Sequence, residues 1–274
     1  MKWYTCSQAQ ITAPGLADAA RRRAFQESRY CVPVGAGADG APAWLDFQWA
    51  AHVLITGTTG SGKSTAVNAI ITALAVRNSP ATAQFIMIDP KRVELRKWRN
   101  LPHLLRPIAT DPAAAVDALT AARANMEKRF QTMELYDVDD VAALPFTCPR
   151  LFVVVDEFAS VSSDKRTAAA AMAIMKDLAR LGRAAGVHLI LATQYARADV
   201  VDTQIRANVP ARVAFRTMTA TESKVAIDAP GAENLRGPGA GFLRDASGDV
   251  QRIRGLYVDR RQIDTVVKFY TDQM

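Results

Sequence analysis

The chain has 274 residues and a formal net charge of +7, with 34 Lys and Arg against 27 Asp and Glu. Hydrophobic residues make up 49% and charged residues 22%, which excludes a disordered or fibrous chain and suits one α/β domain with some additional chain. The longest apolar run, residues 168–175, is less than half of the roughly 20 residues that a membrane-spanning helix needs. The N-terminus also lacks the apolar stretch of a secretory signal, so we expect neither a membrane anchor nor export.

The three cysteines, Cys6, Cys31 and Cys148, are far apart and form no Cys-x-x-Cys pair. This spacing argues against a disulfide framework and a zinc site, and it suits a reducing cytoplasm. The basic excess comes mostly from arginine, a side chain whose forked guanidinium suits phosphate. Nucleic-acid binding is compatible with this charge, and so is a biased genome composition.

The first 50 residues differ from the rest of the chain. Residues 17–30, with Arg21, Arg22 and Arg23, could form a short basic helix, and the Gly- and Pro-rich residues 33–42 are expected to lack regular structure. We therefore interpret residues 1–50 as a basic N-terminal arm and linker. The compact domain is expected over residues 51–259, followed by a C-terminal helix within residues 260–274.

Short apolar runs alternate with helical patterns from residue 52 onward, and strands covered on both faces have this composition. The strands are predicted at residues 52–56, 84–89, 151–156, 187–193 and 212–215, and the helices at residues 62–77, 112–135, 165–185 and 200–207. This alternation predicts an α/β fold with a mostly parallel central sheet flanked by helices and joined by right-handed crossovers. Residues 241–255 predict a β-hairpin with its turn at 246–249, and a last helix is expected from Asp259 to Tyr270.

A phosphate-binding loop is predicted directly after the first strand. Residues 57–64 read GTTGSGKS and fit Gly-x-x-x-x-Gly-Lys-Ser/Thr at the start of the first helix. Glycines allow the backbone N–H groups to point inward, Lys63 would reach the β- and γ-phosphates, and the Ser64 hydroxyl would bind Mg²⁺. The predicted nucleotide-binding residues are Gly57, Thr58, Thr59, Gly60, Ser61, Gly62, Lys63, Ser64 and Thr65.

Two acids end the strand at residues 151–156. Asp156 would hold the magnesium ion, and Glu157 would orient and deprotonate the attacking water, which favours hydrolysis over binding alone. A complete extra strand lies between the phosphate loop and these acids, an order typical of one branch of the P-loop ATPases.

The next strand ends in Thr193 and Gln194. Gln194 could sense the γ-phosphate beside the two acids, or it could form an ordinary hydrogen bond at the strand end. His52, His103 and His188 lack the spacing of metal ligands, and we expect them to be structural.

Several blocks of sequence resemble the FtsK/SpoIIIE family of DNA translocases, and they occur in the family's order. These blocks are GTTGSGKS, IMIDPKRVEL (86–95), LPHLL (101–105), VVVDEFA (153–159), RAAGVHLILATQ (183–194), ANVPARVAF (207–215) and GPGAGFL (237–243). The resemblance implies a RecA-like P-loop NTPase motor that forms a hexameric ring and moves double-stranded DNA through its pore with ATP and Mg²⁺.

The same resemblance implies that each nucleotide site lies between subunits and receives an arginine from the neighbouring subunit. Arg183 occupies the matching position, and Arg180 is the alternative, although either residue could be a solvated helix residue. Arg197 and Arg206 match a region that lines the family's pore, where arginines would hold DNA phosphates without regard to sequence, and ordinary surface charge is the alternative.

The chain is shorter than family members that act in cell division, with 56 residues before Gly57 and 17 after Tyr257. We therefore expect an isolated motor domain, and we hypothesise that it derives from a plasmid, an integrative element or a phage. A nucleotide-switched assembly ATPase and a genome-packaging or protein-secretion ATPase are the alternatives. Glu157 counts against the switch, and the MIDPK and LATQ blocks favour DNA translocation over secretion.

Overall fold

The computed structural model describes residues 28–161, 167–198 and 200–273. Most of the basic helix predicted at residues 17–30, including its three consecutive arginines, lies outside these residues. In the described part of the chain, no helix is long and apolar enough to cross a membrane.

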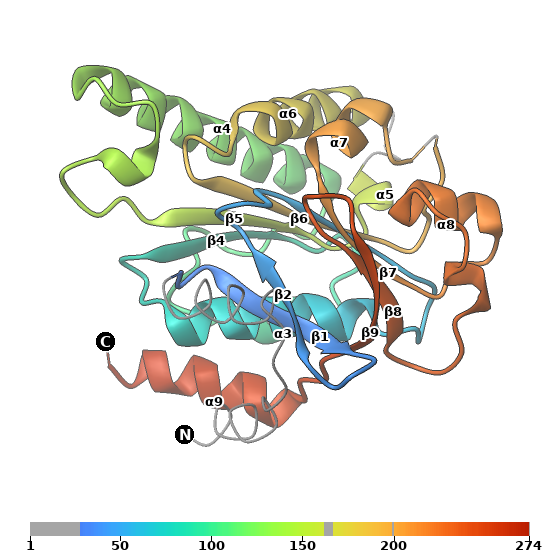
Figure 1. Cartoon of the computed structure of the whole chain (residues 1–274). Coiled ribbons are helices and arrows are strands. Elements are labelled where there is room, and N and C mark those ends of the chain that lie inside the picture. Colours follow the sequence, from blue (N-terminus) through green and yellow to red (C-terminus); the bar gives the residue numbers. More distant parts are fainter. Residues whose placement is uncertain (1–27, 162–166, 199, 274) are drawn as a thin grey trace.

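A single nine-stranded sheet runs through the described residues in the order β2-β1-β9-β8-β7-β3-β6-β5-β4 (Figure 1). Its parallel part consists of the five strands that the sequence predicts, which are β3 (Val53–Thr56), β4 (Ala83–Ile88), β5 (Arg150–Val155), β6 (Val187–Thr193) and β7 (Ala211–Phe215). Their predicted ends are correct to within one residue. The prediction of an α/β fold with a parallel core is therefore confirmed.

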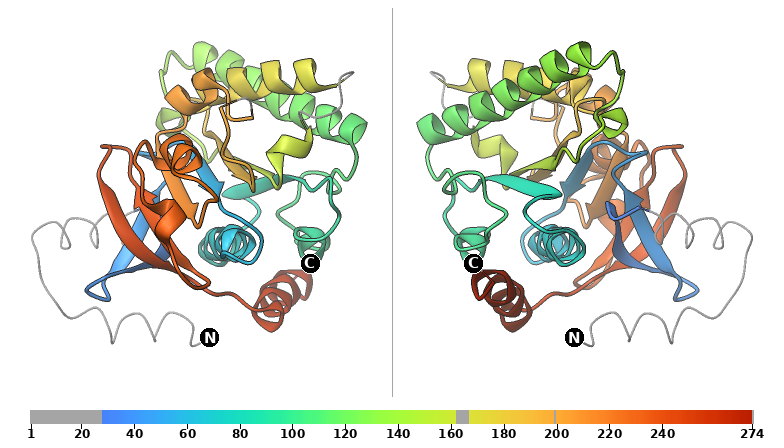
Figure 2. Two further views of the ribbon diagram at one scale, coloured as in Figure 1. Left: turned by 90° about the vertical axis from the view of Figure 1, so that its right-hand side faces the viewer. Right: turned by 90° about the vertical axis from the view of Figure 1, so that its left-hand side faces the viewer.

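Helices cover both faces of this sheet (Figures 1 and 2). One face packs against α4 (Pro112–Leu135), α6 (Ala168–Leu181), α7 (Thr203–Asn208) and α8 (Ala220–Ile227), and the other packs against α3 (Lys63–Arg77) and α9 (Arg260–Thr271). Alternate residues of each strand point to opposite faces, so that Leu54 joins the first core and Val53 and Ile55 join the second. This double burial explains why the strands are almost continuously apolar.

The helix predictions hold with small changes of length. α4 has the predicted ends, and Asp111 caps it by accepting a hydrogen bond from the N–H of Ala114. α6 is shorter than predicted, and α8 was not predicted. Within the described residues, the remaining helices are the single turn α5 (Phe158–Val161) and 3-10 turns at Arg96–Trp98, Val141–Ala143 and Ala232–Asn234.

Four antiparallel strands extend the sheet beyond β7. They are the predicted hairpin of β8 (Ala240–Arg244) and β9 (Val250–Gly255), and an N-terminal hairpin of β1 (Cys31–Gly37) and β2 (Pro42–Asp46). β1 joins the two hairpins because it pairs with β2 on one side and with β9 on the other.

The expectation that residues 33–42 lack regular structure is wrong. Pro33 lies where β1 pairs only with β2, and a strand tolerates proline where one of its sides has no neighbouring strand. Gly35 is required by packing, because a Cβ there would lie 2.7 Å from the carbonyl oxygen of Arg254 in β9. Pro33 therefore lies where β1 has a neighbouring strand on one side only, and Gly35 lies where β9 approaches closely. Neither residue interrupts the sheet.

Candidate nucleotide site

The GTTGSGKS segment forms a tight loop between β3 and α3. Gly60 has φ +74°, a left-handed conformation that costs glycine nothing, and Ser61 N–H donates to the carbonyl oxygen of Thr58 at 3.1 Å. The loop is tied to its surroundings because Thr58 N–H donates to Arg216 at 2.9 Å, and Gly239 N–H donates to Ser61 at 2.8 Å. The loop therefore begins the helix in the place that the motif predicts.

Phe215 supports this loop from below and is 1% exposed. Its side chain lies within 3.3 Å of the positions that a Cβ would take on any of four glycines, which are Gly57, Gly62, Gly241 and Gly255. Glycine is needed at these positions because the aromatic ring fills the space. Phe215 thus packs against both the phosphate loop and the β8–β9 hairpin.

Lys63 and Asp156 form a buried ion pair beneath the loop. Lys63 Nζ lies 2.7 Å from Asp156 Oδ1, and the two side chains are 5% and 3% exposed. Burial raises the pKa of Asp156, while the charge of Lys63 acts in the opposite direction. The structure therefore brings together the lysine of the phosphate loop and the acid at the end of β5.

Glu157 follows Asp156 in a left-handed backbone conformation, with φ +55°, and its side chain is 1% exposed. Its two carboxylate oxygens are both held: Oε2 lies 3.0 Å from Lys91 Nζ, and Oε1 accepts hydrogen bonds from Thr193 Oγ1 and the N–H of Gln194. A left-handed conformation is uncommon for a residue with a side chain, and it turns this carboxylate toward the end of β6. The ends of three neighbouring strands, β4, β5 and β6, thus meet at one acid.

Gln194 lies beside the phosphate loop. Its Oε1 accepts a hydrogen bond of 3.2 Å from Thr59 Oγ1, and its backbone N–H donates to Glu157. Gln194 thus forms the strand-end hydrogen bonds and connects the loop to the acid, while its role in sensing the γ-phosphate stays a prediction.

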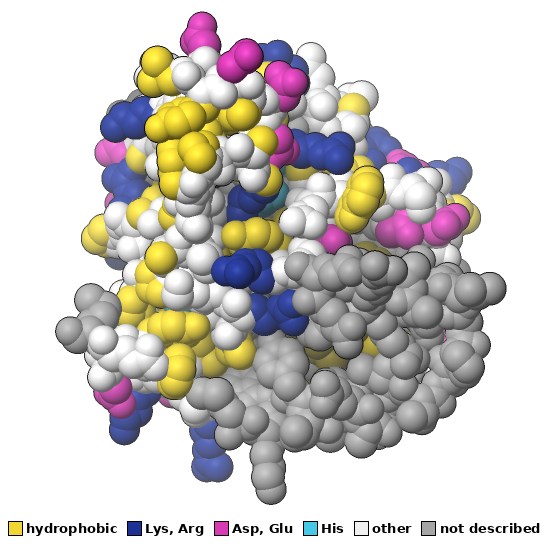
Figure 3. Space-filling model, turned by 60° about the vertical axis from the view of Figure 1, so that its left-hand side comes forward, with side chains coloured by type: hydrophobic (Ala, Val, Ile, Leu, Met, Phe, Trp, Pro, Cys, Tyr) yellow, Lys and Arg dark blue, Asp and Glu magenta, His cyan; other side chains and the backbone are white. Residues whose placement is uncertain are grey.

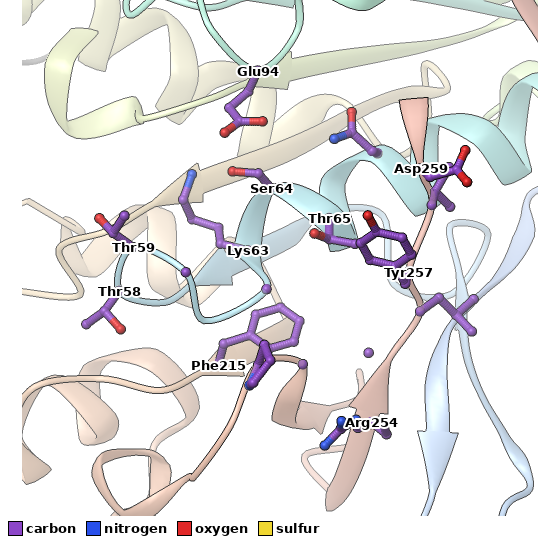
Figure 4. A pocket seen from close by; sticks show the side chains of 18 of the residues that line it. Thr58, Thr59, Lys63, Ser64, Thr65, Glu94, Phe215, Arg254, Tyr257 and Asp259 are labelled. Carbon is purple, nitrogen blue, oxygen red and sulfur yellow. The ribbon is translucent and has the colours of Figure 1, made fainter. Parts of the chain in front are cut away.

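A cavity of about 640 Å³ opens above the phosphate loop (Figure 4). Loop residues Thr58 to Thr65 line one end, and residues 254–260 between β9 and α9 line the other. This cavity is also lined by charged and aromatic residues that were not predicted from the sequence, namely Glu94, Lys97, Arg254, Tyr257 and Asp259. Glu94 lies in the IMIDPKRVEL block, but no motif singles out the other four.

The residues present fit a magnesium ion. The Ser64 hydroxyl lines the cavity, and Asp156 supplies a carboxylate, so both donors are the hard oxygen ligands that Mg²⁺ prefers. Asp89 adds a fully buried carboxylate near Asp156, and its Oδ1 has no hydrogen-bond partner in the described residues. No cluster of three or more His, Cys, Asp or Glu forms a metal site in the part of the chain that is described. Mg²⁺ bound with few protein ligands, together with water and phosphate oxygens, is compatible with this set.

A family model for FtsK/SpoIIIE matches residues 15–147, which include the phosphate loop and the IMIDPKRVEL block. Curated relatives extend the match over most of the chain. The DNA translocase FtsK of Lactococcus lactis subsp. cremoris is 36% identical over 261 residues. The chain belongs to the FtsK/SpoIIIE family.

The chain covers only part of these relatives. The Lactococcus alignment spans 88% of this chain and 34% of the relative, and the FtsK of Helicobacter pylori strain 26695 is 37% identical over 91% of this chain and 30% of the relative. The chain thus spans about a third of the length of the curated FtsK proteins that it matches.

Solved structures support the same fold. The cytoplasmic domain of the type VII secretion ATPase EccC from Thermomonospora curvata is 30% identical, with a TM-score of 0.76 over 88% of this chain and 31% of that chain. The pCW3 conjugation coupling protein TcpA, solved with ATPγS, has a TM-score of 0.77 at 23% identity, over 90% of this chain and 72% of that chain. The fold is therefore that of a RecA-like P-loop NTPase, as the sequence predicts.

Arg183 lies at the end of the sheet where the parallel strands begin, whereas the phosphate loop lies where they end. The Arg183 side chain is exposed. It precedes β6, whereas Gln194 follows β6, and the seven residues of this strand span roughly 20 Å. Figure 3 shows the left-hand side of Figure 1, where β5 and β6 begin and where Lys and Arg side chains lie between hydrophobic ones. Within one chain, Arg183 is therefore separated from the nucleotide site by the length of a strand. Arg180, the alternative, forms an ion pair with Asp177.

The two predicted DNA contacts lie in different surroundings. Arg197 is exposed in the segment after β6. Arg206, in α7, donates to Asp228 at 2.8 Å, and the same aspartate pairs with Arg212 and Arg244. Arg206 thus belongs to a cluster that connects α7, β7, β8 and the end of α8.

Proposed function

We propose that this chain is the ATP-hydrolysing motor of a double-stranded DNA translocase. The main support is the arrangement at the end of β5, where Asp156 faces the phosphate-loop lysine and Glu157 is fixed beside it. A protein that only binds a nucleotide can dispense with the second acid. The curated relatives named DNA translocase indicate the substrate, and their match covers most of this chain.

Lys63, Asp156 and Glu157 have different roles in ATP hydrolysis, which follow from their positions. Lys63 exchanges Asp156 for the β- and γ-phosphates of ATP, since both are anionic partners within reach of its ammonium group. Mg²⁺, held by Ser64 and Asp156, would neutralise the charge of the phosphates. Glu157 accepts the proton of the attacking water, and its bonds to Lys91, Thr193 and Gln194 hold the carboxylate in place for this role.

Arg183 completes the site only in an assembly. Because it lies before the start of β6, a strand's length from its own phosphate loop, it can stabilise the transition state at the site of a neighbouring copy and not at its own. A head-to-tail ring places the β6 start of one copy against the phosphate loop of the next. We propose a hexamer on the family resemblance.

Double-stranded DNA would contact the segment between β6 and β7. Arg197 is exposed there, and Arg206 pairs with Asp228 and would have to share its guanidinium with a phosphate. Substituting a single arginine that binds phosphate should lower the slope of log affinity against log salt by about 1. Arg197→Ala and Arg206→Ala test this, and an unchanged slope in both variants would exclude this segment.

The decisive experiment measures ATP hydrolysis with and without double-stranded DNA, together with displacement of a triplex-forming strand. Wild type should show stimulated hydrolysis and displacement, and Glu157→Gln should bind ATP but hydrolyse it about 10²- to 10⁴-fold more slowly. Arg183→Ala should bind ATP without stimulation. Full hydrolysis by Arg183→Ala would show that Arg183 does not stabilise the transition state.

Other outcomes separate the alternatives. Stimulated hydrolysis without strand displacement would favour a nucleotide-switched assembly ATPase. A hydrolysis rate that DNA does not change would favour packaging or secretion of another substrate. A cytoplasmic location and an origin in a plasmid, an integrative element or a phage remain part of the proposal. The motor domain and the terminal helix are likewise proposed, but the arm cannot extend to residue 50, because residues 31–46 form β1 and β2 of the same sheet.

A further inference from the structure

The cavity above the phosphate loop has two chemically different ends. One end carries the loop amides, Lys63 and Ser64, which suit phosphate. The other carries the run Leu256, Tyr257 and Val258, which offers aromatic and apolar surface. Figure 4 shows Tyr257 on the far side of Thr65 from Lys63. The end away from Lys63 therefore adds an aromatic and apolar stretch, which is flanked by Arg254, Asp259 and Arg260.

The direction of a bound nucleotide follows from this change. In a phosphate loop the lysine reaches the β- and γ-phosphates, so the terminal phosphate lies at Lys63 and Asp156. The ribose and base must then lead away from these residues, past Ser64 and Thr65. The next surface in this direction is the segment that carries Tyr257.

Tyr257 has an unusual environment for an aromatic residue, because 77% of its surface is exposed. An exposed ring at the rim of a cavity provides a flat π-face, and aromatic bases stack on such faces with little regard to their hydrogen-bonding edges. Leu256 and Val258 on either side are only partly exposed. The Tyr257 ring is therefore more exposed than the residues on either side of it.

The segment that carries Tyr257 is fixed at its strand end. Gly255 N–H donates to Gly239 at 2.7 Å, and Leu256 N–H donates to Val34 in β1 at 3.3 Å. Gly239 also donates to Ser61 in the phosphate loop at 2.8 Å. The phosphate end and the apolar end of the cavity are therefore joined through a short chain of backbone hydrogen bonds.

The segment is also fixed at its helix end. Asp259 and Gln262 form a capping box, in which each side chain accepts a hydrogen bond from the other residue's N–H at 2.8 Å. α9 is then anchored on α3 because Tyr270 Oη donates to the carbonyl oxygens of Ala75 and Asn78, at 2.8 and 2.9 Å. Such a preformed surface binds a ligand with little loss of conformational entropy.

We propose that Tyr257 is the stacking platform for the purine base of the nucleoside triphosphate bound at this site. The inference rests on the proposed function, since it assumes that the phosphate loop binds a nucleotide. A purine is favoured over a pyrimidine because its two rings cover more of the aromatic face.

The test compares ATPγS with inorganic tripolyphosphate, both with Mg²⁺, on the full chain. Tyr257→Ala should bind ATPγS at least about fivefold more weakly and should bind tripolyphosphate as wild type does. Tyr257→Phe keeps the ring and should bind ATPγS within about twofold of wild type. Tyr136→Ala is the matched control, because Tyr136 is 49% exposed and lies outside the cavity.

A second variant reports on stacking directly. Tyr257→Trp should change its fluorescence on addition of ATPγS but not of tripolyphosphate, relative to the signal of the four native tryptophans in wild type. This variant keeps an aromatic ring, so its result does not depend on whether Tyr257→Ala folds. Absence of a base-dependent signal would overturn the proposal.

The failures of the two proposals are distinguishable. If wild type binds neither ligand, or Lys63→Ala binds both as wild type does, the proposed function fails. If wild type binds both ligands and Tyr257→Ala loses nothing, only the stacking platform fails. Equal weakening of both ligands by Tyr257→Ala would likewise overturn the platform, because it would show an effect on the phosphate end.

Discussion

Lys91 Nζ lies 3.0 Å from Glu157 Oε2, and the lysine is 43% exposed whereas the glutamate is 1% exposed. The lysine comes from the loop after β4 and the glutamate from the loop after β5, so the pair joins two neighbouring strand ends. Together with the two hydrogen bonds from the end of β6, it leaves the carboxylate of Glu157 little freedom to turn.

We predict that Lys91→Ala lowers kcat for ATP by about 10- to 100-fold with little change in KM, because Glu157 loses one of its fixed partners while the phosphate loop is intact. Lys91→Arg should restore part of the rate, since it returns a cation to the same place. Steady-state ATPase kinetics test this. Lys128→Ala, an exposed lysine on α4, is the control. An unchanged kcat in Lys91→Ala would mean that the ion pair does not position the acid.

Thr193→Val should both slow hydrolysis and destabilise the protein. The substitution keeps the shape of this fully buried residue but removes the hydroxyl that donates to Glu157 Oε1. A buried carboxylate oxygen that loses a donor costs about 1–3 kcal/mol. Urea unfolding and ATPase rates should show both losses, and Thr193→Ser should recover them. If Thr193→Val is as stable as wild type, the hydrogen bond is not formed in solution.

Gly255→Ala should destabilise the protein by about 1–3 kcal/mol through overpacking, because its Cβ would lie 2.9 Å from Cε1 of Phe215. Adding Phe215→Leu should relieve this clash, so the double variant should be more stable than the sum of the two single effects predicts. Free energies of unfolding from urea titrations give the coupling. Gly255→Ala with Phe152→Leu, in β5 five strands away, should be additive. Additivity in the Phe215 pair would contradict the packing described for the phosphate loop.

Stability should fall as the pH is lowered from about 6.5 toward 4 because of His52. Its Nδ1 accepts a hydrogen bond from the N–H of Leu189 at 2.9 Å, so this nitrogen carries no proton in the folded state. Burial lowers the pKa of His52 to about 4, whereas the unfolded residue titrates near 6.5. The unfolded state therefore binds more protons as the pH falls from 6.5 toward 4, and stability is lost in that direction.

The expected loss from His52 is about 1 kcal/mol on going from pH 7.5 to 5.5. Urea unfolding at the two pH values measures it. His52→Asn offers a non-titrating acceptor in place of Nδ1 and should reduce this pH dependence. An equal pH dependence in the variant would assign the effect to other groups, such as His188, whose pKa is also lowered by burial.

The phosphate end of the site could be predicted because its residues are adjacent in sequence. Residues 57–65 form one loop and the start of α3, and Asp156 and Glu157 directly follow one strand, so local pattern and strand direction suffice to place them. The partners of Glu157 could not be found in this way. Lys91, Thr193 and Gln194 come from two other strands, and only the order of the strands in the sheet brings them to one carboxylate.

The other end of the cavity and the N-terminal hairpin were missed for a related reason. Tyr257 belongs to no motif, and its place at the cavity depends on how α9 packs against α3. β1 and β2 are short strands rich in Gly and Pro, which local rules assign to loops. The pairing of β1 with β9, which is more than 200 residues away in the chain, is a long-range contact that a local pattern does not encode.

The pairing of β1 with β9 decides where the chain can be shortened. A truncated variant that starts at residue 51 would remove the hairpin, leave β9 as an open edge and take the Phe47 ring away from Phe152 and His188. Such an edge invites aggregation between copies. It would also delete the Val34 carbonyl that holds Leu256. Any minimal version of this protein must therefore retain the chain from about residue 28 onward.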